Sequence, residues 1–366
     1  MIKYIGSKRA LVPLIARIVE RLPVRTACDL FAGTTRVGQA LRSQGRIVHS
    51  NDTATYSEAL GLAYVAAGER DRRRLPGLLA ELQALPARRG YFTETFCERS
   101  RFLQPHNGSR VDAIRAGIEG LDLEPVERGL VLTSLLEAAD RVDSTCGLQM
   151  AYVKRWAPRS FGDLELRVPH PVPGPAGSVS RLDARRLAPD LDVDMVYLDP
   201  PYNQHSYFSN YHVWETLVRW DAPAHYGVAC KRIDCRTEKS PFNSRRDAWA
   251  ALEHTVAAVR SPWLLASVSD EGFHRPDDLL ALLAQKGYVA RVEVEGARYV
   301  GARIGIHNPS GERVGRVSHV RNREYLILAG PSRAQVNAAL RGLGRPGSPG
   351  GPARTDRGRT LAGSSR

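Results

Sequence analysis

The feature that most constrains this chain is the tetrapeptide Asp199-Pro200-Pro201-Tyr202, which directly follows the apolar run from Met195 to Leu198. A short apolar run bounded by turn residues is typical of a strand buried in a sheet. In open α/β sheets, ligands bind outside the carboxyl ends of such parallel strands. The prolines fix φ and lack N–H groups, so nearby carbonyls are held stiffly and remain free to accept hydrogen bonds. The sequence therefore predicts a rigid polar lip at the end of a buried strand.

The groups on this lip suit a flat ligand that donates hydrogen bonds. The carboxylate of Asp199 and the carbonyl of Pro200 supply two acceptors, and Tyr202 supplies a ring on which a base can stack. A planar heterocycle with an exocyclic amino group matches this set. Taken alone, these residues are also compatible with a strand that simply ends in a proline-rich turn.

A second motif lies near the N-terminus, where an apolar strand runs into a glycine-rich turn and a helix over residues 28–38. Gly33 allows the backbone to approach a ligand closely at the first turn of a doubly wound sheet. The spacing matches neither the Gly-x-Gly-x-x-Gly dinucleotide motif nor a Walker phosphate loop. Asp52 follows the next expected strand and is placed to accept hydrogen bonds from ribose hydroxyls. An acid at a strand end is often only a helix cap, but together with Asp199 these signals predict a nucleoside cofactor beside a base-binding lip.

The order of three motifs resembles that of a known family. The segment 4–9 comes first, then 29–33, then 199–202, as in the alpha group (Dam type) of the S-adenosylmethionine-dependent DNA adenine-N6 methyltransferases. The resemblance covers residues 2 to 330, and Ser7 departs from it because many relatives have glycine there. Further similar stretches are 107–115, 143–154 and 322–326.

The resemblance implies a Rossmann-like methyltransferase fold, an α/β architecture in which helices flank a seven-stranded, mostly parallel sheet. Residues 1–52 and 178–330 would form the catalytic domain. Residues 53–177 would form an inserted, mainly helical target-recognition subdomain, because the segment lacks strand–helix alternation and is too long for a loop. Residues 331–366, beyond one possible short helix, are rich in Gly, Pro, Ser and Arg and predict a basic, disordered tail.

Hydrophobic periodicity and breaker residues place the individual elements. Strands are predicted at 26–31, 47–51, 179–182, 193–198, 263–267, 289–294 and 324–329. Helices are predicted at 11–21, 57–85, 211–220, 246–260 and 277–286, the last ending at Gly287.

The cofactor residues implied by the resemblance are Tyr4, Lys8, Asp29, Phe31, Gly33, Asp52 and Asp183. Tyr4 and Lys8 would line the methionine end of S-adenosylmethionine, where Lys8 could pair with its carboxylate, and Asp29 would lie near the sulfonium. Phe31 and Gly33 would form the turn under the cofactor, while Asp52 would hold its ribose. Asp183 matches the acid that contacts the amino group of the cofactor's adenine. An equally good interpretation is that Asp183 only caps the following helix.

The catalytic residues implied by the resemblance are Asp199, Pro200, Pro201 and Tyr202. The amino nitrogen N6 of adenine is a poor nucleophile because its lone pair is delocalised into the ring. Acceptors on Asp199 and Pro200 would favour the geometry with a localised lone pair. An adenine inside double-stranded DNA cannot reach the lip, so it must be flipped out and stacked on Tyr202, with Tyr207 or Phe208 helping to close the pocket.

Composition agrees with an intracellular nucleic-acid enzyme. The formal net charge is +13, but residues 331–366 contribute +6 of it through seven arginines and one aspartate, so the charge supports DNA binding only in part. Five cysteines without a Cys-x-x-Cys pair predict free thiols in a reducing cytoplasm, and their spacing is poor for a metal site. No apolar run approaches the ~20 residues of a membrane span, and no signal peptide is visible.

Three other functions are compatible with the same core. Methylation of cytosine N4 uses the same geometry, but those enzymes usually carry Ser where this chain has Asp199. An RNA adenine methyltransferase would share the core, although the N-terminal motif and the large insertion favour DNA. A DNA-binding module without catalysis would not need every element of the site. The leading hypothesis is a site-specific adenine methyltransferase that requires no metal and belongs to a restriction–modification system with a possible cognate endonuclease.

Overall fold

The computed structural model of the chain describes residues 1–6, 8–153, 155–297, 321–343 and 345–346. Its centre is one mixed sheet with the strand order β10-β8-β9-β7-β4-β1-β2-β3. The strands are β1 (Thr26–Asp29), β2 (Ile47–Asn51), β3 (Ser178–Ser180), β4 (Met195–Leu198), β7 (Trp263–Ser269), β8 (Tyr288–Ala297), β9 (Arg321–Gly330) and β10 (Arg345–Pro346). The seven strands predicted from the sequence are all present, and the two-residue β10 adds an eighth at the edge.

Strand pairing is parallel from β3 through β2, β1 and β4 to β7, and antiparallel at β7–β9, β9–β8 and β8–β10. Among the seven long strands, β9 alone runs in the opposite direction, as expected for a mostly parallel sheet. The chain passes from β1 outward through β2 to β3, then returns to place β4 on the other side of β1. This reversal creates a topological switch point between β1 and β4, where ligands bind in doubly wound sheets.

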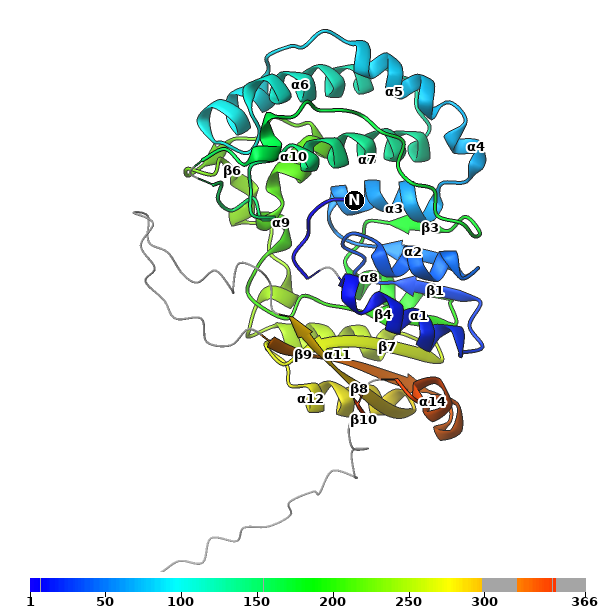
Figure 1. The fold of residues 1–366 in the computed structure, drawn as a ribbon. Helices are drawn as coiled ribbons and strands as arrows, with labels where there is room; N and C mark the ends of the chain where they lie inside the picture. Colours follow the sequence, from blue (N-terminus) through cyan, green and yellow to red (C-terminus); the bar gives the residue numbers. More distant parts are fainter. Residues whose placement is uncertain (7, 154, 298–320, 344, 347–366) are drawn as a thin grey trace, which may run out of the picture.

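Helices cover both faces of the sheet (Figure 1). On one face lie α1 (Val12–Glu20), α2 (Arg36–Ser43) and α14 (Arg333–Leu340), which share a core with Tyr197 and Leu265. On the other face lie α8 (Ala184–Leu187), α11 (Ala248–Ala258) and α12 (Pro276–Leu283), packed against Val196 and Leu264. Alternate residues of β4 and β7 thus point into opposite cores, so both strands are apolar throughout.

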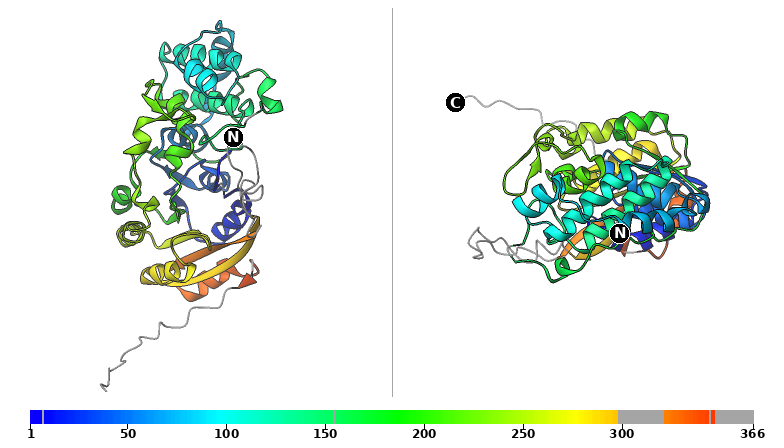
Figure 2. Two further views of the ribbon diagram at one scale, coloured as in Figure 1. Left: turned by 90° about the vertical axis from the view of Figure 1, so that its left-hand side faces the viewer. Right: turned by 90° about the horizontal axis from the view of Figure 1, so that it is seen from above.

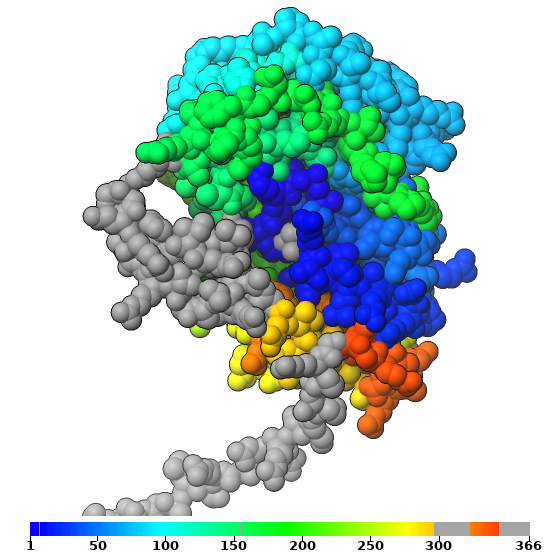
Figure 3. Space-filling view, in the orientation of Figure 1, coloured from blue at the N-terminus to red at the C-terminus, as the bar shows by residue number. Residues whose placement is uncertain are grey.

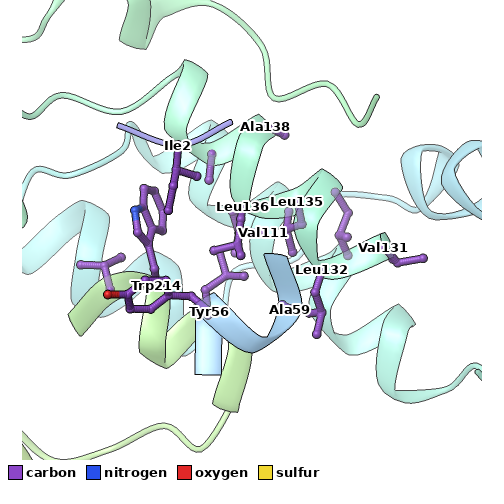
Figure 4. Packing of buried hydrophobic residues seen from close by; sticks show 14 of the residues in the cluster. Ile2, Tyr56, Ala59, Val111, Val131, Leu132, Leu135, Leu136, Ala138 and Trp214 are labelled. Carbon is purple, nitrogen blue, oxygen red and sulfur yellow. The ribbon is translucent and has the colours of Figure 1, made fainter. Parts of the chain in front are cut away.

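A second, helical part stands beyond the β3 end of the sheet, as the side view in Figure 2 makes clear. It comprises α3 (Thr55–Gly61), η2 (Leu62–Ala66), α4 (Glu69–Arg72), α5 (Leu75–Ala84), η3 (Thr93–Arg99), α6 (Pro105–Glu119), α7 (Pro125–Arg141), α9 (Tyr207–Asn210) and α10 (His212–Arg219). Figure 4 shows Tyr56, Val111, Leu135 and Trp214 gathered in its core. Trp214 belongs to a helix that follows β4, so the expected insertion 53–177 shares its core with a later segment of the chain.

Short elements complete the described chain. They are η1 (Lys8–Ala10), η4 (Pro158–Phe161), η5 (Ala188–Asp190), η6 (Ile233–Arg236), η7 (Pro241–Asn243), η8 (Ala284–Lys286) and a hairpin of β5 (His225–Tyr226) and β6 (Lys231–Arg232). No helix within the described residues is both long and apolar enough to cross a membrane.

Two sequence expectations need correction. The single helix predicted over 57–85 is divided, because Gly68 adopts an extended conformation and Pro76 starts a new helix. The tail from residue 331, expected to be disordered apart from one possible short helix, begins with α14, which is capped by Ser332 and buries Val336 and Ala339 against the sheet. Those apolar residues cover sheet surface that would otherwise be exposed to water. The rest of that tail, residues 347–366, lies outside the described residues.

Candidate active site

A cavity of about 330 Å³ opens at the switch point between β1 and β4. Its wall includes the turn after β1, the lip after β4 and the N-terminal segment, which Figure 3 shows in dark blue between the helical part and the β7–β9 end of the sheet. The predicted residues in its lining are Tyr4, Lys8, Asp29, Phe31, Gly33, Asp52, Asp183, Asp199 and Pro201. The structure thus brings together side chains from the three sequence motifs.

Strand register explains how Asp199 is held. Leu198 pairs with Ala266 on the parallel strand β7, so the next residues, Asp199 and Ser267, lie side by side. The Ser267 hydroxyl donates to Oδ1 of Asp199 at 2.8 Å, and the Tyr197 hydroxyl donates to Ser267 Oγ at 2.8 Å. Tyr197 and Asp199 point to the same face because side chains alternate along a strand. The position of the carboxylate is therefore fixed from two neighbouring strands.

Lys8 lies against this carboxylate. Its Nζ atom is 3.1 Å from Asp199 Oδ1, 3.4 Å from the Tyr202 hydroxyl and 3.7 Å from Glu324 Oε2. Burial raises the pKa of Asp199, while the Lys8 ammonium opposes that rise. Burial alone would lower the pKa of Lys8, but Asp199, Tyr202, Glu324 and Tyr197 together outweigh it and leave that pKa raised. Lys8 is thus paired with Asp199 and Glu324, and its predicted pair with a cofactor carboxylate stays a prediction.

Asp29 is the buried acid of the cavity. Its Oδ2 accepts a hydrogen bond from the Gly38 amide at 3.0 Å, whereas its buried Oδ1 has no hydrogen-bond partner among the described residues. Burial, with Asp199 and Asp52 nearby, raises the pKa of Asp29 to about 7. An acceptor left without a donor in the wall of a cavity fits a ligand that brings positive charge or a donor.

Asp52 holds the glycine turn in place. Its Oδ2 accepts from the Gly33 amide at 2.8 Å and its Oδ1 from the Ala54 amide at 3.0 Å. Burial raises its pKa, although these backbone hydrogen bonds act in the opposite direction. Each carboxylate oxygen can accept more than one hydrogen bond, so these contacts leave capacity for hydroxyls of a ligand.

Aromatic rings close the side of the cavity formed by the N-terminal segment. Tyr4 is stacked on Tyr207 and on Tyr211, with ring centroids 5.2 and 4.5 Å apart. The Ile5 amide donates to the Tyr211 hydroxyl at 2.5 Å. These contacts fix the N-terminal segment over the turn after β1.

Gly33, which lines the cavity, allows a direct test of the predicted cofactor site. Its φ of +51° favours glycine, and a Cβ atom there would lie 3.2 Å from Tyr4 Cε1. We expect Gly33→Ala to weaken S-adenosylmethionine binding by roughly tenfold, because about 1–2 kcal/mol of left-handed strain and the displaced Tyr4 both distort the turn. Isothermal titration calorimetry measures the affinity.

Gly45 provides the matched control. Its φ of +81° carries similar strain in alanine, but a Cβ atom there meets no atom within 4 Å and lies outside the cavity. Gly45→Ala should lower the melting temperature without changing cofactor affinity. Equal affinities for the two variants would contradict the role given to Gly33.

The remaining predicted residues have mixed placements. Asp183 caps α8 by accepting from the Arg185 amide, and its carboxylate pairs with the Arg185 guanidinium at 2.7 Å, which lowers the pKa of Asp183. It therefore combines the helix cap with a place in the cavity wall. Phe31 packs edge-on against Phe242 at 5.1 Å, a partner far along the sequence.

Two lip residues lie outside the cavity lining. Tyr202 is half-buried, and its backbone carbonyl accepts from the Phe273 amide at 2.7 Å. Pro200 is buried, and no hydrogen bond recorded within the described residues uses its carbonyl. Tyr207 and Phe208, the rings expected to close the pocket, both contribute to its wall.

Sequence reasoning assigned no role to three residues of the contact network around Asp199 and Lys8, namely Tyr197, Ser267 and Glu324. Each lies on a strand that was correctly predicted, but polar residues near strand ends are common and nothing local links them. Pairing the predicted strands in a methyltransferase-like order would have placed Ser267 beside Asp199. Within the described residues, no group of three or more His, Cys, Asp or Glu side chains is arranged to hold a metal ion.

Comparison with known proteins gives a consistent family. The model of the D12 class N6 adenine-specific DNA methyltransferases matches residues 4–262. Modification methylase StsI of Streptococcus sanguinis is 28% identical over 316 residues, covering 81% of this chain and 48% of that protein. Modification methylase LlaI of Lactococcus lactis subsp. lactis is 27% identical, covering 81% of this chain and 51% of that protein. The chain thus spans about half the length of these two relatives.

A shorter relative matches along most of its length. Type II methyltransferase M.NlaIII of Neisseria lactamica is 27% identical over 317 residues, which cover 81% of this chain and 92% of that protein. Among solved structures, magnesium protoporphyrin IX methyltransferase from Synechocystis PCC 6803 with bound SAM aligns over 89% of this chain and 80% of its own. Its TM-score is 0.32 at 8% identity, too low to carry weight.

Proposed function

Since the chain belongs to the D12 class of N6 adenine-specific DNA methyltransferases, we propose that it methylates N6 of a flipped-out adenine at a specific site in double-stranded DNA. The family match and relatives named as modification methylases support this activity. Membership of the Dam-type alpha group is part of the proposal, supported by the order of the three motifs. So are a cytoplasmic location and a cognate restriction endonuclease.

One observation carries the proposal. The carboxylate of Asp199 stands at the end of β4 in the wall of a cavity that also holds Asp29, at the end of β1, and Asp52, directly after β2. In this proposal Asp199 is an acceptor for an amino group, next to a site for a ligand with hydroxyls and positive charge. We also propose that residues 1–52 and 178–330, together with α14, form the catalytic part, and that residues 53–177, whose core includes α10, serve target recognition.

Two features fit the cavity to S-adenosylmethionine. The buried Oδ1 of Asp29, which has no hydrogen-bond partner among the described residues, suits a cationic group. A side chain at Gly33 would make a tight contact with Tyr4, its Cβ atom lying 3.2 Å from Tyr4 Cε1. In our assignment Asp29 faces the sulfonium, Asp52 holds the ribose, and Tyr4, Phe31 and Gly33 line the remainder. S-adenosylmethionine supplies the transferable methyl group.

The residues of the protein contribute to the reaction by making N6 of the adenine a better nucleophile. Asp199 and the Pro200 carbonyl accept hydrogen bonds from the two N–H groups of N6. These hydrogen bonds favour localisation of the nitrogen lone pair as the bond between N6 and the methyl group forms. Both acceptors are held before the substrate arrives, Asp199 by Ser267 and the Pro200 carbonyl by the rigid proline pair. Such preorganised acceptors avoid reorganisation during the reaction. After methyl transfer, N6 carries a positive charge and loses one of its two hydrogens as a proton.

The activity test compares substrates directly. The purified protein is incubated with tritiated S-adenosylmethionine and unmethylated double-stranded DNA or RNA, and the modified base is identified by mass spectrometry. We expect N6-methyladenine in DNA alone. N4-methylcytosine, or label only in RNA, would replace the proposed substrate, and absence of any transfer would favour a DNA-binding module without catalysis.

Cofactor binding should depend on pH through Asp29. The pKa of the Asp29 carboxyl in the cavity is about 7, so the group is largely protonated below that pH. A cationic sulfonium favours the ionised form, so binding releases a proton and affinity rises as pH increases from about 6 to 8. Titration calorimetry over this range measures the change.

The variant Asp29→Asn serves as the control for that dependence. It cannot ionise, so its weaker binding should vary little over the same pH range. A wild-type affinity that is flat with pH, or that falls as pH increases, would separate Asp29 from the sulfonium.

A further inference from the structure

Glu324 lies far from the three motifs in sequence, although its side chain contacts Lys8 in the fold. It is on β9, opposite Ser269 of β7, and therefore on the same sheet face as Ser267. Its side chain is 16% exposed, and Oε2 is 3.7 Å from Nζ of Lys8. Lys8 is buried, so its ammonium group lies between two carboxylates, those of Asp199 and Glu324.

The contacts of Asp199 are unevenly divided between its two oxygens. Ser267 Oγ and Lys8 Nζ both approach Oδ1, at 2.8 and 3.1 Å. No described residue is recorded as donating a hydrogen bond to Oδ2. One oxygen is thus occupied by the protein, and the other is left for a substrate donor.

We propose that Glu324 is a positioning residue for methyl transfer that acts through Lys8. By sharing the ammonium group, Glu324 keeps Lys8 on the Oδ1 side of Asp199 and prevents Lys8 from neutralising that carboxylate completely. Oδ2 then retains the negative charge that attracts the N6 hydrogen of adenine. This inference rests on the proposed function.

Charge balance explains why a second acid is needed. A single buried lysine beside a single carboxylate forms a neutral pair, and the ammonium competes with any incoming donor. With Glu324 present, the single ammonium group of Lys8 is shared by two carboxylates, so the cluster of the three groups keeps a net negative charge. The other titratable groups facing this cluster are Tyr197, Tyr202, Tyr207 and the acids Asp29 and Asp270.

The test uses Glu324→Gln, which keeps the size of the side chain and removes its charge. We expect kcat for DNA methylation to fall roughly tenfold, equivalent to about 1.4 kcal/mol, with cofactor affinity unchanged. Lys8 would then serve Asp199 alone and lower the pKa of its carboxyl. The acid limb of the kcat profile should therefore move to lower pH, a shift that a purely structural role would not produce.

Two further variants complete the test. Glu324→Asp keeps the charge and should recover part of the lost kcat. Glu293→Gln makes the same change on the neighbouring strand β8. Glu293 lies outside the cavity lining and pairs with Arg323 at 3.3 Å, so this variant should leave kcat unchanged.

Failure of this inference and failure of the proposed function have different signatures. Wild-type protein that methylates DNA while Glu324→Gln matches it in kcat and pH profile would overturn the positioning role alone. A parallel loss of cofactor affinity and melting temperature in Glu324→Gln would overturn it as well, by showing a structural role. Absence of methylation by the wild type would refute the proposed function itself.

Discussion

Replacing Asp199 by asparagine should reduce DNA methylation by roughly 10²–10³-fold and leave S-adenosylmethionine binding almost unchanged. The substitution keeps the shape of the side chain but removes the charge that attracts the N6 hydrogens. Loss of one preorganised hydrogen-bond donor from an oxyanion hole costs about 2.7–4 kcal/mol, and we expect a comparable cost for loss of this acceptor. Single-turnover methylation with saturating cofactor measures the chemical step, and calorimetry measures cofactor binding.

Asp194 offers a control at the opposite end of the same strand. Its carboxylate accepts hydrogen bonds from the Arg25 and Thr26 amides at 2.7 and 2.9 Å. Asp194→Asn should lower stability while preserving turnover. If Asp199→Asn retained more than about a tenth of wild-type turnover, less than 1.4 kcal/mol would be missing and the role given to Asp199 would be wrong.

Replacing Tyr202 by alanine should strongly impair methylation but weaken duplex DNA binding only slightly. The ring is proposed to stack on the flipped adenine, a contact worth about 1–3 kcal/mol per base. Most of the affinity for DNA comes instead from phosphate contacts elsewhere. A duplex with 2-aminopurine at the target position reports flipping, since its fluorescence rises as the base leaves the stack.

The Tyr202 hydroxyl also lies 3.4 Å from Nζ of Lys8, so stacking must be separated from that contact. Tyr202→Phe keeps the ring and removes the hydroxyl, and it should retain most of the activity that Tyr202→Ala loses. Equal defects in both variants would assign the effect to Lys8 instead. An active enzyme that never raises 2-aminopurine fluorescence on its own site would contradict flipping and favour a single-stranded substrate.

Local sequence was sufficient for the strands that build the site. The run before Asp199 is short, apolar and bounded by turn residues, and the run before Asp52 is short and begins with two β-branched residues; both form strands close to the predicted limits. Prediction was poorer where local signals compete. The helical pattern over 57–85 continues through Gly68, and only its extended backbone in the fold divides it.

The tail illustrates the limit of composition. Residues 331–366 together are rich in Gly, Pro, Ser and Arg, and the average conceals the apolar positions of α14. Val336 and Ala339 are buried because the sheet beneath them offers an apolar face. A segment of eight residues becomes a stable helix through such packing, since isolated helices of that length are marginal in water.

The sequence by itself determined which strands exist, where the lip and the glycine turn lie, and which acids stand at the strand ends. These properties depend on hydrophobic periodicity and on turn residues, and both are local patterns that extend over a few positions of the chain. Only the tertiary structure decided the partners of those acids. Ser267 is 68 residues from Asp199 and meets it through strand register, and Lys8 reaches Asp199 and Glu324 because β4 and β9 both flank β7. Such pairings depend on the order of strands in the sheet, which no local pattern specifies.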